Sequence, residues 1–498
     1  MKADEARLHL EAAENFADIA QVKAEGREEN LRRAIDGYKK ALLYFTRDKS
    51  KTEYARIQNS LGIVYGRLAE IRDKEKNIER AIKAFKEALK IYKPDAFSLD
   101  YAMTQNNLGN AYISLAEVRD KENNLKHAIK AFEEALTIYT PESFPVQYAM
   151  TQNNLGIAYR NLADVREKEN NLTLAIKAYE EALTIYTPDA FPVDYAMTQN
   201  NLGIAYSNLA DVRIKENNLN RAIQAYEEAL TIYTLDAFPV QYATTQNNLG
   251  NAYRLLAEVR EKEDNLKHAI ESFEQALTIY TPDAFPVQYA TTQNNLGAAY
   301  RNLADVREKE KNLKLAIKAF EQALTIYKPD TFPVDYATTQ NNLGIAYETL
   351  AEVRDKEDNL KLAIKSYEQA LTIYTPEAFP VDYAMTQNNL GTAYVNLAGV
   401  MDKENNLKRA IQAYDEALRI RTLEAFPVQY AMTTENLGYT FLVKGDIERG
   451  FDCLQKALAV YQKEGMVDYA KELEDFLKSR PKPVEKQKPQ PRKKKTDE

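Results

Sequence analysis

Apolar residues of this chain recur at helical spacing. In the segment that begins at Pro145, neighbouring apolar positions lie three, four or seven residues apart and comprise Tyr148, Leu155, Tyr159, Leu162 and Val165. Side chains at this spacing lie on one face of an α-helix, and proline suits the first turn of a helix. The pattern therefore predicts a long first helix that runs from Pro145 to about Lys168.

The polar pair Asn170-Asn171 interrupts this pattern. Asparagine is favourable just before the first turn of a helix, so we expect Asn171 to cap a second, shorter helix. The apolar stripe of that helix comprises Leu172, Ala175, Ile176, Tyr179, Ala182, Leu183 and Tyr186. Pro188 and Pro192 are expected to end it and to begin the next pair of helices, because proline does not fit a helix interior.

The whole pattern repeats with a fixed period. A Leu-Gly pair marks each copy, and its leucines, each 47 residues after the one before, are Leu61, Leu108, Leu155, Leu202, Leu249, Leu296, Leu343, Leu390 and Leu437. A helical unit that repeats without insertions buries its apolar face against its neighbours. The sequence thus predicts an all-α fold, an α-solenoid of tandem helix pairs.

Four regions follow from this period. Residues 1–47 match mainly the second half of the unit and are predicted to form a degenerate N-terminal capping repeat. Residues 48–430 hold eight 47-residue repeats, and residues 431–479 hold a shorter C-terminal repeat with a final amphipathic helix. Residues 480–498 are rich in proline and lysine and lack hydrophobic periodicity, so this basic tail is predicted to be disordered.

Glycine stands in the middle of the predicted first helices, for example Gly156. A glycine in a helix interior costs roughly 1 kcal/mol relative to alanine, so its repetition requires a compensating interaction. We expect this compensation to be close packing of the two helices where Gly156 and Ala175 lack bulk.

The set Leu155-Gly156, Tyr159, Ala175, Tyr179, Ala182 and Pro188 resembles the tetratricopeptide repeat pattern. The C-terminal unit has the ordinary spacing of that family, whereas the other units carry seven extra residues between Tyr159 and Ala175 and resemble long prokaryotic-type repeats. The resemblance covers residues 3 to about 479. It implies a right-handed superhelix whose first helices line a concave groove, and a scaffold that binds other proteins.

Two asparagines precede the Leu-Gly pair in most units. Asparagine is a mediocre helix former, so the repeated pair indicates a use for the carboxamide, which offers an extended peptide backbone both a donor and an acceptor. In ladder-type members of the resembled family, the asparagine directly before Leu-Gly holds ligand main chain. By that resemblance the partner-binding residues are Asn107, Asn154, Asn201, Asn248, Asn295, Asn342, Asn389 and Asn436. The alternative is that these amides bond to neighbouring helices, with one asparagine of each pair structural and the other available.

Positions that follow the Leu-Gly pair differ between copies and are therefore free of the packing constraint that keeps the others alike. The most varied of them holds Ile113, Arg160, Ser207, Arg254, Arg301, Glu348 and Val395. These positions form a stripe away from the apolar face, and the resemblance places the stripe in the groove. Arg160, Arg254 and Arg301 are expected to meet acidic groups of a partner. The alternatives are neutral drift on a solvated surface and ion pairs with the next unit.

Charge and composition exclude several classes of protein. The net charge is -8, and residues 480–498 carry eight basic and three acidic residues, which leaves -13 on the repeats and argues against nucleic acid binding along them. No apolar run reaches membrane-spanning length, and the first residues are too charged for a secretory signal. With a single cysteine, Cys453, we expect a cytoplasmic protein without membrane insertion.

The sequence nominates no reaction. It has three histidines, no glycine-rich phosphate loop, no zinc-ligand spacing and no nucleophile beside a plausible base, so we expect no enzyme, no cofactor and no metal. The expected function is a non-enzymatic scaffold for protein–protein interaction that binds an extended peptide or a helix of an unidentified partner. Two alternatives stay open: self-assembly into a structural or regulatory homo-oligomer, and binding of nucleic acid or an anionic surface through residues 480–498.

Overall fold

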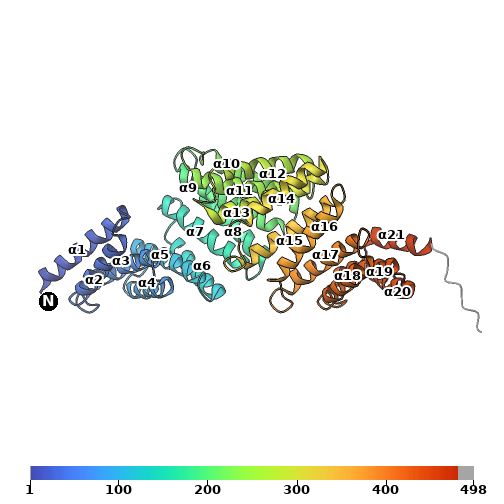
Figure 1. The fold of residues 1–498 in the computed structure, drawn as a ribbon. Coiled ribbons are helices and arrows are strands. Elements are labelled where there is room, and N and C mark those ends of the chain that lie inside the picture. The colour runs from blue at the N-terminus through green and yellow to red at the C-terminus, as the bar shows by residue number, and fades with distance from the viewer. Residues whose placement is uncertain (1, 480–498) are drawn as a thin grey trace, which may run out of the picture. The chain divides into compact units, whose positions relative to one another are not determined.

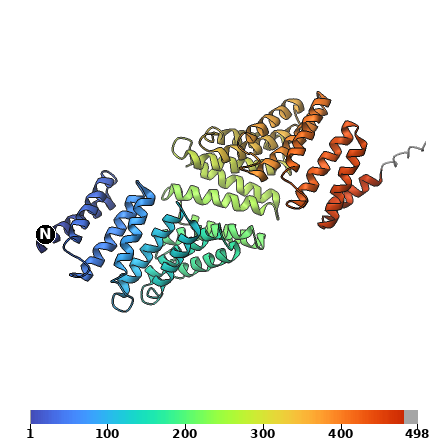
Figure 2. The ribbon, with the colours of Figure 1, turned by 90° about the horizontal axis from the view of Figure 1, so that it is seen from below.

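The computed structural model describes residues 2–479, and the basic tail lies outside the described residues. This part of the chain folds into helices that follow one another in pairs and contains no strand (Figures 1 and 2). It divides into two compact units, Met1–Tyr280 and Thr281–Glu498, here called unit 1 and unit 2. Both units are all-α solenoids of tandem helix pairs, as the sequence predicted.

Unit 1 consists of α1 (Ala3–Val22), α2 (Arg27–Leu42), α3 (Lys51–Ala69), α4 (Lys74–Ala88), α5 (Ser98–Ala116), α6 (Lys121–Leu136), α7 (Pro145–Ala163), α8 (Lys168–Leu183), α9 (Pro192–Ala210), α10 (Lys215–Leu230), α11 (Pro239–Leu256) and α12 (Lys262–Leu277). Unit 2 consists of α13 (Pro286–Ala304), α14 (Lys309–Ala323), α15 (Pro333–Leu350), α16 (Lys356–Leu371), α17 (Pro380–Ala398), α18 (Lys403–Leu418), α19 (Pro427–Lys444), α20 (Ile447–Lys463) and α21 (Val467–Lys478). The odd-numbered helices from α3 to α19 carry the Leu-Gly pair and are called first helices below.

The turn between the two helices of a pair lies earlier than the sequence predicted. Helix α7 ends at Ala163 instead of about Lys168, and α8 already begins at Lys168. The chain turns at Glu167, whose φ of 44° is left-handed, and Val165 is 47% exposed instead of packed on the apolar face. The prediction failed because Glu167-Lys168-Glu169 fits a helix interior as well as a turn.

Asn171 has a different role from the predicted cap. It lies inside the first turn of α8, and its side-chain Nδ2 donates a 2.7 Å hydrogen bond to the main-chain oxygen of Arg166. This bond satisfies a main-chain carbonyl of the turn between α7 and α8. The same bond is made by Asn77, Asn124, Asn218, Asn265, Asn312, Asn359 and Asn406.

The mid-helix glycines lie against aromatic rings. A Cβ atom placed on Gly156 would lie 2.6 Å from the ring of Tyr179, and one on Gly109 would lie 2.5 Å from the ring of Phe132. Real side chains do not approach so closely, so a larger residue would push the two helices apart. The predicted close packing is confirmed, and the group that fills the space is the aromatic ring of the second helix.

Within each unit, a first helix packs on the second helix of its own pair and on the second helix of the pair before it. Neighbouring first helices, such as α5 and α7 or α7 and α9, also come into contact, whereas neighbouring second helices show no comparable contact in the described part of the chain. The first helices of each unit thus lie on the more closely spaced side of the stack. We call the surface that carries the varied stripe of these helices the first-helix face.

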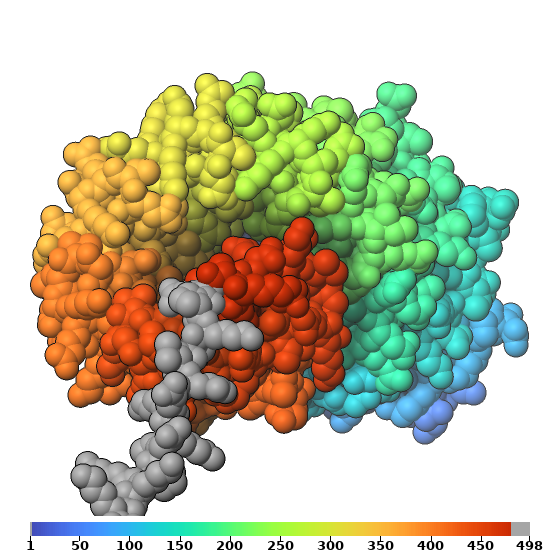
Figure 3. Space-filling view, turned by 90° about the vertical axis from the view of Figure 1, so that its right-hand side faces the viewer, coloured from blue at the N-terminus to red at the C-terminus, as the bar shows by residue number. Residues whose placement is uncertain are grey.

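Helix α21 covers the C-terminal end of unit 2. Its Leu473 is fully buried, and the rings of Phe476 and Tyr469 pack against Tyr439 and Tyr461. The red helices of this end face the viewer in Figure 3. The boundary expected at residue 431 falls inside α19, because this helix begins at Pro427. No helix in residues 2–479 combines the length and the apolar character that crossing a membrane requires.

Candidate functional site

The first asparagine of each pair joins one repeat to the next. Asn106 is 4% exposed, and its Oδ1 accepts hydrogen bonds from Thr151 Oγ1 at 3.3 Å and from Asn154 Nδ2 at 3.4 Å. Asn153 does the same with Thr198 and Asn201 one repeat later. Asn59, Asn200, Asn294, Asn341 and Asn388 are acceptors in the same kind of contact. These amides hold neighbouring first helices in register.

The second asparagine of each pair is only partly buried on the first-helix face. Those that donate one N–H to the preceding repeat are Asn154, Asn201, Asn248, Asn342, Asn389 and Asn436. Asn107 lines the pocket described below, and Asn295 is partly buried at the equivalent position. Within the described residues, the side-chain Oδ1 atoms of Asn154 and Asn248 accept no hydrogen bond, and each Nδ2 donates one. Each of these two amides thus keeps one acceptor and one N–H for another group.

The three arginines named from the sequence lie at equivalent positions, and Arg254 differs from the other two in its contacts. Arg160 donates to the amide oxygens of Asn201 at 3.4 Å and Asn161 at 3.5 Å. Arg301 donates in the same way to Asn342 at 3.3 Å and Asn302 at 3.4 Å. The side chain of Arg254 is 23% exposed, lies 3.8 Å from Glu258 and buries an Nε atom that has no partner. Burial lowers the pKa of Arg254.

The acidic residues near these arginines pair mainly elsewhere. Asp164, Asp211 and Glu258 accept ion pairs from a lysine of the preceding repeat, at 2.9 Å from Lys121, 3.0 Å from Lys168 and 2.6 Å from Lys215. All of these side chains are about half exposed, so each pair contributes little to stability, about 0–1 kcal/mol. Lysines thus form ion pairs between repeats at the turns, and Arg160 is bonded to amides.

Glu348 occupies the position of Arg160 in a later repeat, and the sequence did not single it out. Its carboxylate accepts hydrogen bonds from Tyr367 Oη at 2.9 Å and from Asn396 Nδ2 at 3.0 Å. Burial raises the pKa of Glu348 to about 7, against the opposing effect of these two hydrogen bonds. A periodic pattern indicates which face Glu348 shares, but not how deeply its neighbours cover it.

Tyrosine hydroxyls of the second helices also point to this stripe, a feature that sequence reasoning missed. Tyr226 lies 3.4 Å from Ser207, and Tyr414 lies 3.1 Å from Thr392, measured between hydroxyl oxygens. Tyr179 is fully buried, and its hydroxyl has no hydrogen-bond partner. The signal in the sequence is the alternation of tyrosine and phenylalanine at one position, since Phe132, Phe273 and Phe320 stand where Tyr179 stands.

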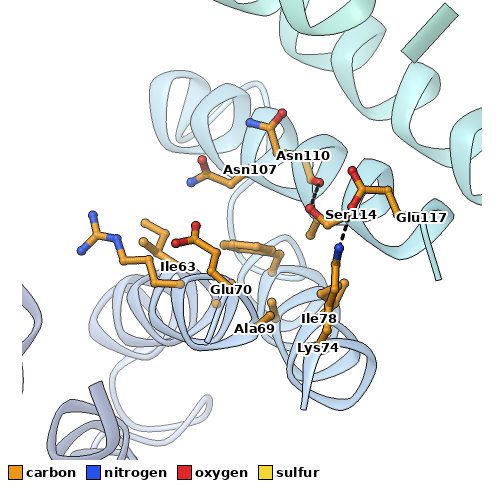
Figure 4. A pocket seen from close by; sticks show the side chains of 15 residues that line it. Ile63, Ala69, Glu70, Lys74, Ile78, Asn107, Asn110, Ser114 and Glu117 are labelled. Carbon is orange, nitrogen blue, oxygen red and sulfur yellow. Dashed lines mark hydrogen bonds and ion pairs between the residues drawn. The ribbon is translucent and has the colours of Figure 1, made fainter. Parts of the chain in front are cut away.

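A pocket of about 410 Å³ opens on the first-helix face between α3 and α5 (Figure 4). Ile63 and Ala69 of α3 and Ile78 of α4 contribute apolar surface, and Asn107 and Asn110 lie on the opposite wall. At its edge, Lys74 and Glu117 form an ion pair of 2.6 Å.

Gly66 lines this pocket and stands at the varied position that Ile113 and Arg160 occupy in later repeats. A Cβ atom on Gly66 would meet no atom within 4 Å. Gly66 therefore has no packing role of the kind that Gly156 has.

No cluster of three or more histidine, cysteine or acidic side chains in the described part of the chain has the geometry to hold a metal ion. The first-helix face carries amides, arginines, hydroxyls and the pocket at Gly66.

Comparison with known families identifies the repeats. Models described as "Tetratricopeptide repeat" match residues 63–95, 243–278 and 297–375. A model described as "Soluble NSF attachment protein, SNAP" matches residues 100–233. No curated protein sequence matches this chain.

Solved structures of low sequence identity also match. BtubC (BKLC) from P. vanneervenii is 20% identical over 56% of this chain and 94% of that chain, with a TM-score of 0.36. A signal transduction ATPase with numerous domains and a tetratricopeptide repeat sensor from Pyrococcus horikoshii is 16% identical over 95% of this chain and 65% of that chain, with a TM-score of 0.47.

The 47-residue period, the helix pairs and the glycine-to-ring contacts agree with these family matches. The chain therefore contains tetratricopeptide repeats, in a long form with a period of 47 residues.

Proposed function

We propose that the first-helix face of unit 1 binds an extended segment of a partner protein, and that this is what the protein does. The observation that carries the proposal is the pocket at Gly66. An extended segment presents a side chain at intervals, and the pocket is large enough to receive one while Asn107 and Asn110 lie beside it.

Gly66 supports this proposal because no packing contact offsets the cost of placing a glycine inside a helix at this position. A glycine in a helix interior costs roughly 1 kcal/mol relative to alanine. For Gly156 the ring of Tyr179 takes the space, whereas the space next to Gly66 is empty. Alanine here would gain helix stability, and a larger side chain would narrow the pocket, so we infer that the open space beside Gly66 is the benefit that this glycine provides.

The second asparagines supply contacts for the main chain of the partner. Asn154 and Asn248 each keep an acceptor and an N–H, which match the N–H and C=O groups of an extended backbone. Each such hydrogen bond contributes about 0.5–1.5 kcal/mol net. In unit 1 the ladder residues proposed to act in this way are Asn107, Asn154, Asn201 and Asn248, and the equivalent residues of unit 2 are Asn295, Asn342, Asn389 and Asn436.

The test replaces Gly66 with isoleucine, the residue that the next repeat carries as Ile113. Random 16-residue peptides displayed on phage are selected on the wild-type protein, and enriched peptides are synthesised with amidated C-termini for fluorescence anisotropy. We expect G66I to fold and to bind these peptides at least 10-fold more weakly. The matched control T173I adds the same side chain on the exposed face of α8 and should bind as the wild type does. Failure to enrich any peptide, or equal binding by G66I, would overturn the proposal.

A further inference from the structure

We propose that Arg160, Tyr179 and Asn208 form a subsite for the side-chain carboxylate of an aspartate or glutamate in the bound segment. The proposal rests on the function proposed above and adds which side chain is recognised and where. The subsite is built by three helices of unit 1: α7 supplies Arg160, α8 supplies Tyr179 and α9 supplies Asn208.

The protein contains an internal template for this subsite. In a later repeat the equivalent residues are Glu348, Tyr367 and Asn396, each 188 residues after its counterpart. There the carboxylate of Glu348 accepts hydrogen bonds from Tyr367 Oη at 2.9 Å and Asn396 Nδ2 at 3.0 Å. A tyrosine hydroxyl and an asparagine amide at these positions are thus placed to hold one carboxylate.

At the equivalent place beside α7, the two donors are present as Tyr179 and Asn208, but Arg160 replaces the carboxylate of Glu348. Tyr179 is fully buried, and its hydroxyl has no hydrogen-bond partner. Asn208 is partly buried, and no described residue forms a hydrogen bond with its side chain. Phenylalanine at the equivalent position of other repeats shows that packing does not require the oxygen of Tyr179. A buried hydroxyl without a partner destabilises a fold, so a ligand that accepts a hydrogen bond from it accounts for it.

Arg160 supplies the charge that such a ligand needs. Its guanidinium forms no ion pair within residues 2–479, and its two hydrogen bonds to Asn201 and Asn161 are long, at 3.4 and 3.5 Å. A guanidinium forms shorter and stronger bonds with a carboxylate than with an amide oxygen. Burial raises the pKa of Tyr179 and Tyr226, and the positive charge of Arg160 opposes both shifts.

Neighbouring repeats show why the subsite is confined to this one. Arg254 has Glu258 at 3.8 Å, and its second helix carries Phe273 in place of the tyrosine. The tyrosine of the next repeat, Tyr226, already faces Ser207 at 3.4 Å. Among the described repeats of unit 1, only helices α7 to α9 combine an arginine that forms no ion pair, Arg160, with a tyrosine hydroxyl that has no hydrogen-bond partner, Tyr179.

The test uses the enriched, amidated peptides described above, so that no terminal carboxylate is present. Each aspartate and glutamate of the best peptide is replaced in turn by asparagine or glutamine. We expect one replacement to weaken wild-type binding at least 10-fold and to have no effect on binding to Arg160→Ser, a variant that carries the serine of the next repeat. Tyr179→Phe should weaken binding of the acidic peptide several-fold while its thermal unfolding midpoint stays equal or rises.

The control is Arg166→Gln, which removes the same charge from an exposed arginine that pairs with Glu122 and Glu167. It should bind as the wild type does. Peptides that bind in a Gly66-dependent way, but with no acidic residue whose replacement matters, would overturn the subsite and leave the proposed function standing. Peptide binding that is insensitive to G66I would overturn the proposed function instead.

Discussion

The hydroxyl of Tyr367 donates a 2.9 Å hydrogen bond to Glu348, a carboxylate whose pKa burial raises to about 7. The folded protein therefore binds this proton more tightly than the unfolded chain, in which the ordinary pKa of 4.5 applies. The resulting stabilisation is complete below about pH 4.5 and is lost as the pH rises through about 7. Its upper limit is about 3 kcal/mol.

We predict that Glu348→Gln removes this dependence, because a neutral amide still accepts the hydrogen bond of Tyr367. Denaturant unfolding at pH 5 and pH 8 should show a smaller difference for the variant than for the wild type, with the variant more stable at pH 8. Glu404→Gln, at an exposed position, serves as the control and should retain the wild-type difference. An unchanged difference in Glu348→Gln would show that Glu348 does not titrate in this range.

The hydroxyl of Tyr179 should destabilise the fold that contains it. Removing a buried hydroxyl without a partner relieves a cost of about 1–3 kcal/mol, so Tyr179→Phe should raise the free energy of unfolding by about 1 kcal/mol. Tyr367→Phe is the matched comparison and should lower it, because that hydroxyl has an acceptor in Glu348. Thermal unfolding followed by circular dichroism measures both, and a loss of stability in Tyr179→Phe would reveal a partner for its hydroxyl.

Replacing two glycines of the first helices with alanine should change the stability of the protein in opposite directions. Gly66→Ala should stabilise the protein by up to about 1 kcal/mol, because a Cβ atom there meets nothing within 4 Å. Gly156→Ala should destabilise it by about 1–3 kcal/mol, because the added atom would lie 2.6 Å from the ring of Tyr179. The measurement is the unfolding midpoint of each variant. Midpoints that both rise or both fall would contradict the prediction.

Replacing each of the two asparagines of one pair with alanine should also lower stability by different amounts. Asn153→Ala removes a buried acceptor and leaves Thr198 and Asn201 without it, at an expected cost of about 1–3 kcal/mol. Asn154→Ala removes only one long donor bond of 3.4 Å and should cost less than about 1 kcal/mol. Denaturant unfolding of both variants, with peptide binding measured in parallel, separates a structural amide from a binding one. Equal losses of stability would make both asparagines structural.

The sequence was sufficient for the architecture because every architectural feature occurs many times. The 47-residue period, the paired helices and the close approach at Gly156 each recur from repeat to repeat, so local ambiguity averages out. The position of the turn was missed, since Glu167 takes a left-handed conformation that its residue type does not signal. Periodicity likewise could not show that Asn171 bonds back to Arg166.

The candidate site was less accessible to sequence reasoning, because its distinctive groups depend on atoms one repeat away. The stripe that holds Arg160 and Glu348 was identified from the differences between copies. The empty space beside Gly66 and the unpartnered hydroxyl of Tyr179 were not identified from the sequence. The first depends on the absence of neighbouring atoms, and the second on the absence of a hydrogen-bond acceptor. A pattern records which residues are present, whereas these features arise from contacts that are missing.

The amide contacts between first helices join positions that are always 48 residues apart, as Asn154 to Asn106 and Asn201 to Asn153. Each repeat offers its successor the same acceptor that its predecessor offered to it. If one whole 47-residue segment were excised from within unit 1, the new neighbours would meet through an identical junction. Gene-level gain or loss of whole repeats can therefore change the length of the binding surface in steps, without any new interface having to evolve.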